Sequence, residues 1–266
     1  MIHSYRVIVL VLLIVITTSA NSFAYIPPVN EFKAAASLSY YVYDEPDVMK
    51  IKGLLYGISG SYTYTYKEAL MLRVDGNFNY GSMKYTSVDS GDDSGIPDYL
   101  MEFRFLMGPD LFPMNKLMIT PYIGMGYRYL HDDSSGHLTS SGYAGLLRVS
   151  NYYYLPIGIS ATTDYIKGWV FSLLAEYDYL GRGRQKSYTS ETGSSFDVVN
   201  YQIYGYGMKF SLSCRKRVGK LDYLIEPFIT YWDIGRSEDV LEPDNFLYYE
   251  PANNTVQYGL NMGVQF

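Results

Sequence analysis

The sequence predicts an all-β chain that folds as a transmembrane, antiparallel up-and-down β-barrel of ten strands. Three observations predict this fold. Apolar and polar side chains alternate in segment after segment, no apolar run after the first two dozen residues approaches the ~20 residues of a helical span, and tyrosine is unusually frequent. Because side chains of a strand point to opposite faces in turn, each strand gains one apolar and one polar face. A closed barrel whose apolar faces meet lipid satisfies all these strands together.

The last strand, residues 255–266, shows the alternation most clearly. Small or polar residues occupy one face, and large apolar residues occupy the other. The apolar face consists of Val256, Tyr258, Leu260, Met262, Val264 and Phe266. The strand therefore ends on an aromatic residue at the carboxyl terminus.

This terminal strand resembles the signature of bacterial outer-membrane β-barrel proteins, and the whole of residues 34–266 is similar in architecture to the small OmpA-type and opacity-protein barrels of Gram-negative bacteria. In that class the barrel-assembly machinery reads the final aromatic strand, here Tyr258, Leu260, Met262, Val264 and Phe266. The resemblance implies an outer-membrane location and a structural or adhesive surface role. It also implies contacts with outer-membrane lipid, lipopolysaccharide and periplasmic chaperones. It supplies no cofactor, ligand or oligomeric state.

The first 24 residues have the pattern of a secretory signal peptide. His3 and Arg6 precede the apolar run 7–16, and Ser22-Phe23-Ala24 is a small-x-small cleavage pattern. A second possible cut follows Ala20. We therefore expect a signal peptide over residues 1–24, a short periplasmic lead-in over residues 25–33 and the barrel over residues 34–266.

The other nine strands follow the same period of two. In order, they are expected over residues 34–43, 54–66, 70–80, 99–107, 117–129, 152–159, 169–179, 204–212 and 221–231. The second and third form the clearest hairpin, with a very short turn near Lys67. Pro121 lacks an N–H donor, so we expect a local bulge or a weakened ladder there.

The connections provide a second argument for ten strands. We expect long connections after every odd strand, including residues 85–97, 131–150, 181–197 and 236–254, and short ones after every even strand. In outer-membrane barrels the long loops face outside, so an even number of strands leaves both termini in the periplasm. An eight-stranded barrel is the alternative, and it requires dissolving the sixth or the first strand.

The composition favours a membrane interface and argues against nucleic acid as a partner. Tyrosine suits a boundary where one end of the ring is apolar and the other is wet, and the chain has 31 Tyr against 12 Phe and 2 Trp. The formal charge is −6, which does not suit a polyanionic partner. The single cysteine, Cys214, is expected in a turn beside residues 215–217 and has no partner for an internal disulfide.

A set of charged residues is predicted on the inward face. It comprises Arg73, Asp75, Glu102, Arg104, Arg128, Glu176, Asp178, Lys209, Asp222 and Glu226. A ten-stranded barrel is narrow, so opposite charges can pair across it and plug the lumen. The alternative is a small gated pore, because lumen-facing side chains set the selectivity of a barrel. A soluble, lipocalin-like barrel would instead expose this set to solvent.

Two classes of enzyme also use barrels of this kind. The ten-stranded omptin proteases carry an Asp–Asp and an Asp–His pair that face each other across the outer mouth. Here His131 and His137 are not in an Asp-x-His arrangement, and Thr139 stands where lipid-modifying barrels have the serine of a His-x-Ser pair. The acidic segment 89–93 lacks the spacing of a calcium loop. We therefore expect no catalytic residues and no metal site.

Overall fold

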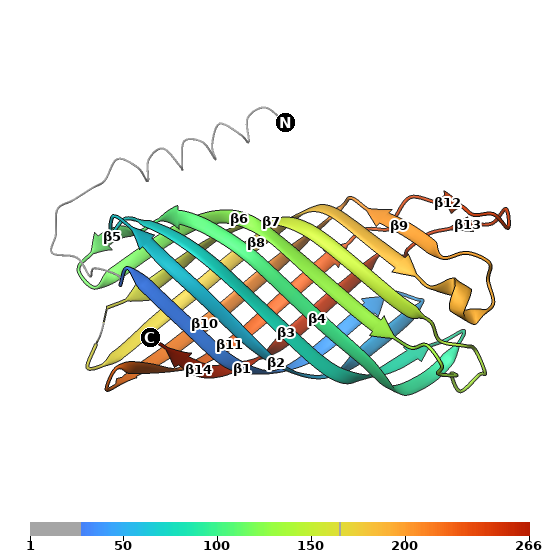
Figure 1. Ribbon diagram of the computed structural model, residues 1–266, viewed down its shortest axis with the longest axis horizontal. Helices are drawn as coiled ribbons and strands as arrows, with labels where there is room; N and C mark the ends of the chain where they lie inside the picture. The colour runs from blue at the N-terminus through green and yellow to red at the C-terminus, as the bar shows by residue number, and fades with distance from the viewer. Residues whose placement is uncertain (1–27, 165) are drawn as a thin grey trace, which may run out of the picture.

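The computed structural model describes residues 28–164 and 166–266, and it shows a closed antiparallel barrel of ten strands. Each strand pairs with its neighbours in chain order, and β14 pairs back onto β1 (Figure 1). The barrel strands are β1 (Asn30–Glu45), β2 (Met49–Tyr66), β3 (Leu70–Ser87), β4 (Gly91–Pro109), β6 (Leu117–Asp133), β7 (Leu147–Thr163), β8 (Trp169–Ser187), β10 (Gly205–Val218), β11 (Leu221–Ile234) and β14 (Asn253–Gln265). The prediction of a ten-stranded barrel is confirmed, and the eight-stranded alternative is wrong.

Four short strands and one turn of helix complete the described chain. β5 (Leu111–Met114) pairs with β6, and β9 (Val198–Gln202) pairs with β8 beyond the end of β10. β12 (Val240–Leu241) and β13 (Leu247–Tyr248) form a small hairpin, and η1 (Thr189–Thr192) is a 3₁₀ turn. No helix in the described ranges is long and apolar enough to cross a membrane.

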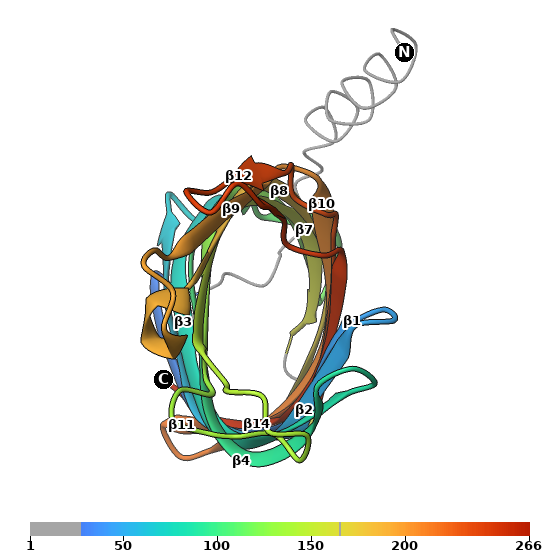
Figure 2. The same ribbon diagram turned by 90° about the vertical axis from the view of Figure 1, so that its right-hand side faces the viewer.

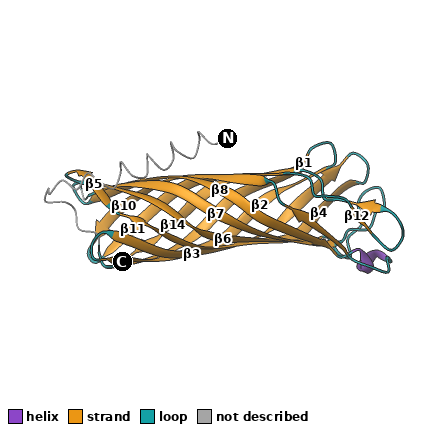
Figure 3. Cartoon of the chain, turned by 90° about the horizontal axis from the view of Figure 1, so that it is seen from above, coloured by secondary structure: helices purple, strands orange, loops and turns teal. Residues whose placement is uncertain are grey.

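The barrel has two unlike ends, seen from the side in Figure 3 and end-on in Figure 2. At the loop end, residues 134–146, 188–204 and 235–252 join consecutive barrel strands. At the turn end the connections are shorter, and two of them are the turns 67–69 and 219–220. Both ends of the described chain lie at this turn end, because Thr65 donates its N–H to the carbonyl of Val29 and Phe266 pairs with Phe32.

Several predicted boundaries are wrong because the strands are longer than their alternation suggests. β1 begins at Asn30, so residues 30–33 of the predicted lead-in belong to the barrel; the predicted signal peptide lies outside the described residues. The predicted loop 85–97 is mostly strand, with a turn at residues 88–90, and only residues 46–48 join β1 to β2. Long connections therefore follow only three of the five odd strands.

The physical reason is that the extended segments bury side chains inside the barrel. Ile51, Met83 and Ile96 are each at most 2% exposed and pack together, although they flank polar sequence. A β-bulge between Met83 and Lys84 shifts the register of β3 against β4 and lets both strands continue. Local polarity suggested loops, and burial against distant strands overrode it.

Two smaller expectations are corrected at β10 and β6. Cys214 lies within β10, paired with Phe171 of β8 and Ile225 of β11, and not in a turn. At Pro121 the register does not shift, so there is no bulge. The ladder on the other side of β6 ends at Ile123 and resumes with β5 at Ile119, so the proline lies in an interrupted stretch of ladder.

The outer wall carries a ring of tyrosines with one from every barrel strand. In order from β1 to β14 these are Tyr40, Tyr56, Tyr80, Tyr99, Tyr129, Tyr153, Tyr179, Tyr206, Tyr231 and Tyr258. Some are direct cross-strand partners, such as Tyr56 with Tyr80 and Tyr40 with Tyr258, and the others are offset by the stagger of the strands. We call this set the tyrosine ring.

A second set of aromatic residues marks the turn end of the outer wall. Phe32 stacks on Phe266 with ring centroids 5.7 Å apart, and Trp169 and Tyr223 lie near the corresponding ends of their strands. Eight residues separate Phe32 from Tyr40, which is about 26 Å along a strand, or about 20 Å once a tilt of roughly 40° is included. Exposed apolar residues fill the interval, among them Ile58 and Met125. The interval matches the apolar band of a transmembrane barrel.

The apolar band predicts a position-dependent penalty for a charge on the outer wall. Phe103 on β4 points outward, four residues from Tyr99 of the tyrosine ring. Phe103→Arg is expected to lower the free energy of unfolding in phosphatidylcholine vesicles by ~2–4 kcal/mol, because it places a charge near the bilayer midplane. Thr86→Arg, on β3 beyond the ring toward the loop end, is the control and should have little effect. Equal penalties at both positions would contradict the membrane band.

Candidate functional site

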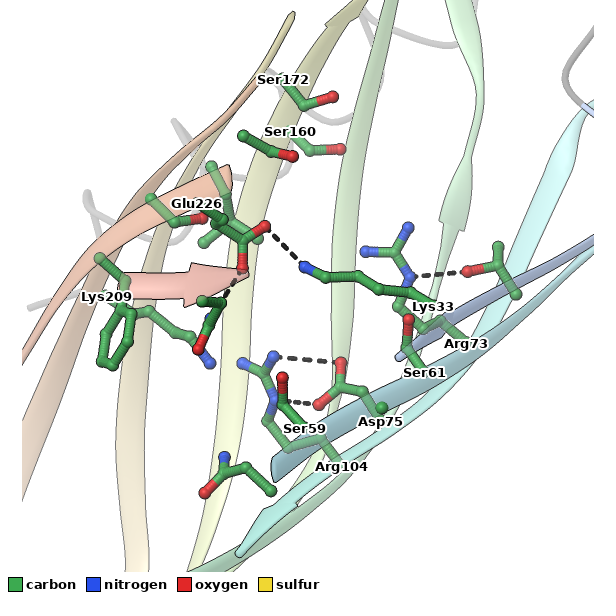
Figure 4. A pocket seen from close by; sticks show the side chains of 18 of the residues that line it. Lys33, Ser59, Ser61, Arg73, Asp75, Arg104, Ser160, Ser172, Lys209 and Glu226 are labelled. Atoms are coloured by element: carbon green, nitrogen blue, oxygen red, sulfur yellow. Dashed lines mark hydrogen bonds and ion pairs between the residues drawn. The ribbon is translucent and has the colours of Figure 1, made fainter. Parts of the chain in front are cut away.

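A cavity of about 210 Å³ occupies the turn-end half of the lumen. Hydroxyl, amide and charged side chains from across the barrel wall line it, and ten of the lining residues are labelled in Figure 4. Pro28 and Gln265 lie at its turn-end rim, and Leu100 and Trp232 lie at the opposite end. The polar faces predicted from the alternation therefore enclose a wet space.

Arg104 of β4 is the centre of the charged network that lines this cavity. Its Nε and Nη2 donate to Oδ1 and Oδ2 of Asp75 at 2.7 and 3.1 Å, and its Nη1 donates to Glu176 of β8. The hydroxyl of Tyr122 donates to the second oxygen of Glu176 at 2.7 Å. Residues from β3, β4, β6 and β8 thus meet in one set of charge-assisted hydrogen bonds across the lumen.

Glu102 forms a second centre, two residues from Arg104 on the same face of β4. Tyr154 and Asn77 donate to its two carboxylate oxygens at 2.6 and 3.1 Å. The Nζ of Lys209 lies 3.6 Å from the oxygen that Asn77 contacts. Glu102 therefore links β10 to β4 across the barrel, as Glu176 links β8 to β4.

The remaining predicted residues do not join these two centres by ion pairs. Glu226 pairs with Lys33 at 2.6 Å and accepts from Asn261 at 3.1 Å, and Asp222 pairs with Arg217 at the turn end. Arg73 donates to the hydroxyl of Thr63 at 2.9 Å. These contacts distribute the predicted charges along the lumen.

Arg128 and Asp178 lie near the indole of Trp232 without an ion pair within 4 Å among the described residues. The guanidinium of Arg128 lies 5.3 Å from the Trp232 ring centroid and 5.8 Å from that of Tyr152. Asp178 is 3% exposed. A Cβ on Gly207 would come within 3.0 Å of both the indole and Asp178, so this glycine makes room for them.

Sequence reasoning missed three polar contacts of the lumen. The alternation predicts Lys33 in the lead-in, Arg215 in a turn and Asn261 only as part of the polar face of the last strand, whereas all three line the cavity. Arg215 is buried, with its Nη1 3.7 Å from Glu31. The signal was present, because Lys33, Ala35 and Ser37 continue the inward alternation of β1.

Two buried apolar clusters lie in the loop-end half of the lumen, which the sequence did not predict. One buried cluster contains Tyr41, Tyr43, Met49, Ile51, Leu55, Met83, Ile96 and Leu100. A second contains Tyr152, Tyr154, Leu180, Trp232 and Ile234, and Leu130 packs against both. The rings of Tyr154 and Trp232 meet edge-on with centroids 5.0 Å apart. These two clusters, which we call the apolar plug, lie between the cavity and the loop end.

Glycine on the neighbouring strand leaves room for the rings of two inward tyrosines, because Gly126 and Gly158 are the cross-strand partners of Tyr154 and Tyr122. A Cβ on Gly126 would lie 2.1 Å from the ring of Tyr154, and a Cβ on Gly158 would lie 2.4 Å from that of Tyr122. Any larger residue at these positions would displace the rings that hold Glu102 and Glu176. The alternation of glycine with apolar residues in β6 and β7 is therefore a packing feature.

A second charged cluster lies toward the loop end, beyond the tyrosine ring. Arg148 contacts Glu45 at 3.0 Å and Asp132 at 2.9 Å, and Tyr43 donates to Glu45 at 2.9 Å and to Glu250 at 3.3 Å. Burial and the neighbouring Glu45 raise the pKa of Glu250 above its usual range. Asp98 is also buried, directly across the β4–β6 ladder from Asp132. The cluster thus contains more carboxyl groups than the single positive charge of Arg148 can neutralise.

The two histidines of the predicted 131–150 connection form no ion pair with this cluster within the described residues. His131 is at the end of β6 and stacks on Tyr99 with ring centroids 4.2 Å apart. His137 lies in the connection itself, with its Nδ1 3.0 Å from Oδ2 of Asp93. Within residues 28–164 and 166–266 no three His, Cys, Asp or Glu residues are grouped in a way that could hold a metal ion.

Comparison with solved structures places this architecture among known barrels. The outer-membrane protease OmpT from Escherichia coli superposes with a TM-score of 0.63 at 9% identity, over 92% of this chain and 99% of that one. The chain has the fold of an outer-membrane β-barrel. The translocator domain of the autotransporter NalP from Neisseria meningitidis gives a TM-score of 0.44 at 9% identity, over 98% of this chain and 95% of that chain. No protein-family model matches the sequence, and no curated protein matches it.

The Arg104 network generates a prediction about the stability of this barrel. Glu176→Gln is expected to lower the free energy of unfolding in phosphatidylcholine vesicles by about 3–5 kcal/mol, because it removes the charge that faces a buried arginine. Asp239→Asn is the control, since its pair with Arg236 is nearly half exposed and should contribute little. A Glu176→Gln protein as stable as the wild type would contradict the assigned role of this pair.

Proposed function

We propose that this chain is an integral outer-membrane β-barrel with a closed lumen, and that it has a structural or surface-interaction role. The observation that supports this most directly is the apolar plug. Its buried side chains lie in the lumen between the cavity and the loop end. A packed apolar layer excludes water and ions.

The outer wall supports insertion in a membrane. The tyrosine ring and the aromatic residues at the turn end border an apolar band of suitable width. We place the loop end outside and the turn end in the periplasm, because long connections of such barrels face outward. The predicted signal peptide is consistent with export, and outer-membrane lipid and lipopolysaccharide would then surround the band.

A small gated pore is the second candidate, and the polar cavity is the observation in its favour. The cavity reaches the turn-end rim at Gln265 but ends against Leu100 and Trp232. Its charges are largely paired, as in the contacts of Arg104 with Asp75 and Glu176. A continuous path would require the plug to rearrange, so we prefer the closed barrel.

We propose no catalytic role, although the fold neighbour OmpT is a protease. Two pairs of residues could be compared with catalytic groups: Asp98 with Asp132, and His137 with Asp93. Both pairs come from the same side of the barrel, from β4, β6 and the connection after β6. They therefore do not face each other across the mouth. Asp98 is 8% exposed, and Asp132 forms an ion pair with Arg148. This arrangement leaves little access for a substrate.

We also propose that the terminal strand is the assembly signal, as the sequence suggests. Phe266 exchanges two backbone hydrogen bonds with Phe32, at 2.8 and 2.9 Å, and thereby joins the last strand to the first. Tyr258 and Met262 are exposed on the outer wall, and Leu260 and Val264 share their face. An assembly factor could read this apolar edge before the barrel closes.

Conductance in planar bilayers tests the closed lumen. The refolded wild type is expected to give no steps above the bare bilayer, whereas the double variant Tyr154→Ala with Trp232→Ala should give measurable steps because it removes the edge-on ring contact of the plug. Tyr153→Ala, on the outer wall, is the matched control. Heat-modifiable migration on gels checks that each protein is folded. Steps from the wild type would favour the pore.

The assembly signal is tested by deleting Phe266. The deletion should leave most of the protein in the periplasm, because both the terminal aromatic side chain and its two hydrogen bonds to Phe32 are lost. Replacement of Phe266 by Tyr should restore surface yield. Fractionation of cells with immunodetection measures the distribution. If the deletion variant reaches the membrane in wild-type amount, the proposal fails.

A further inference from the structure

Four basic side chains lie on the outer wall just beyond the tyrosine ring, toward the loop end. Lys52 and Lys84 are each four residues past the ring tyrosine of β2 and β3, and Arg182 and Arg184 are three and five residues past that of β8. Four residues correspond to about 13 Å along a strand, or about 10 Å of height in a tilted barrel. If the tyrosine ring marks the membrane boundary, this is the depth of lipid headgroups.

The two lysines face each other. Lys52 and Lys84 are direct cross-strand partners in the β2–β3 ladder, and both are exposed. Like charges directly opposite each other in a sheet destabilise it. Among the described residues, neither lysine has a carboxylate within 4.0 Å of its Nζ. The nearby carboxylate of Asp44 pairs with Lys50 instead, at 3.1 Å. The pair is an unfavourable arrangement that a bound anion would make favourable.

The two arginines form a similar pair on the opposite side of the barrel. They are separated by one residue on the same face of β8, so their Cα atoms are about 7 Å apart. The guanidinium of Arg182 lies 4.5 Å from the ring centroid of Tyr201, which fixes its plane. The nearest basic neighbour along β8, Lys186, already pairs with Asp197 at 2.8 Å. A planar guanidinium held in this way matches the geometry of a phosphate.

The acids near this level do not neutralise these four residues. Asp133 accepts from Ser135, and Asp233 accepts from Tyr231. The chain as a whole has a formal charge of −6, so the two basic pairs do not reflect a generally basic surface. The two pairs are therefore local groups of positive charge on the outer wall.

Apolar columns lie directly below both pairs. On β2 the outward residues Leu54, Tyr56 and Ile58 are 47–67% exposed, and on β7 Tyr153 and Leu155 are 57% and 42% exposed. A ligand that combines a phosphate with acyl chains would contact the basic pair and the column together. A soluble polyanion would use only the charges.

We infer that the Lys52–Lys84 pair and the Arg182–Arg184 pair bind phosphate groups on the headgroups of outer-leaflet lipids, with the acyl chains of those lipids lying on the apolar columns below. The partner is thus a phosphorylated glycolipid of the surrounding membrane. This inference rests on the proposed membrane insertion, and it extends that proposal to a defined lipid site at each side of the barrel.

The test compares thermal unfolding in phosphatidylcholine nanodiscs with and without diphosphoryl lipid A. The wild type should unfold at a higher temperature with lipid A, and the variant Lys52→Gln/Lys84→Gln/Arg182→Gln/Arg184→Gln should lose at least half of that increment. Lys67→Gln/Lys116→Gln/Lys220→Gln removes positive charge at the turn end and is the control. It should keep the full increment.

The direction in which Lys84→Gln shifts the unfolding temperature distinguishes lipid binding from a structural role. In phosphatidylcholine alone, Lys84→Gln should unfold at the same temperature as the wild type or higher, because it removes the repulsion from Lys52. In lipid A discs it should unfold at a lower temperature than the wild type. High salt should weaken the lipid A increment, because screening acts on exposed charges.

Three outcomes would overturn the inference. One is an equal lipid A increment in the wild type and the fourfold variant. Another is an increment that persists with lipid A stripped of both phosphates. The third is binding to heparin in solution without a response to lipid A, which would indicate a soluble polyanion. Failure of the wild type to insert into nanodiscs would instead reject the proposed function.

Discussion

The structure depends on closure of one hydrogen-bonded sheet through the ladder between β1 and β14. In a hydrocarbon environment each unpaired backbone N–H or C=O is costly, so a sheet that spans a bilayer cannot have a free edge. The ladder runs from the pair Lys33–Gln265 to the pair Asp44–Asn254, and it continues to Phe32 and Phe266. It is also the contact of longest sequence separation, so it forms only when the other strands are in register.

Closure fixes two environments that never mix along a strand. Every outward position faces the apolar band or the solvent beyond it, and every inward position faces the lumen. The lumen itself is divided into a polar cavity and an apolar plug. Arg104 lines the cavity, where Asp75 and Glu176 compensate its charge. Burial of such a charge is tolerated because carboxylates on two other strands, β3 and β8, accept its hydrogen bonds.

The outer wall is also divided into different environments, here in layers along the barrel axis. The aromatic residues of the turn end, the apolar band, the tyrosine ring and the basic pairs follow one another toward the loop end. Each layer suits a different zone of a bilayer, from hydrocarbon to interface to headgroup. The loop-end extension of the barrel then carries the buried cluster around Arg148, beyond the tyrosine ring.

The sequence by itself determined the number of strands and the face of each residue in the predicted strands, because a period of two leaves one solution for each regular strand. It did not determine that a bulge in β8 turns Arg182 outward. It also contained the tyrosine ring, although only the register shows that one tyrosine comes from each strand. It did not determine which inward charges meet. Arg128 and Glu102 are cross-strand partners, yet the arginine stacks on Trp232 of β11.

Strand length and the plug were decided by tertiary structure alone. Ile51, Met83 and Ile96 flank polar segments that read as loops, and they become strand because they bury one another inside the barrel. Likewise, the ring of Tyr154 reaches Glu102 of β4 only because Gly126 on the intervening strand leaves room for it. Local alternation sets the direction of a side chain, and only the closed barrel decides what that side chain meets.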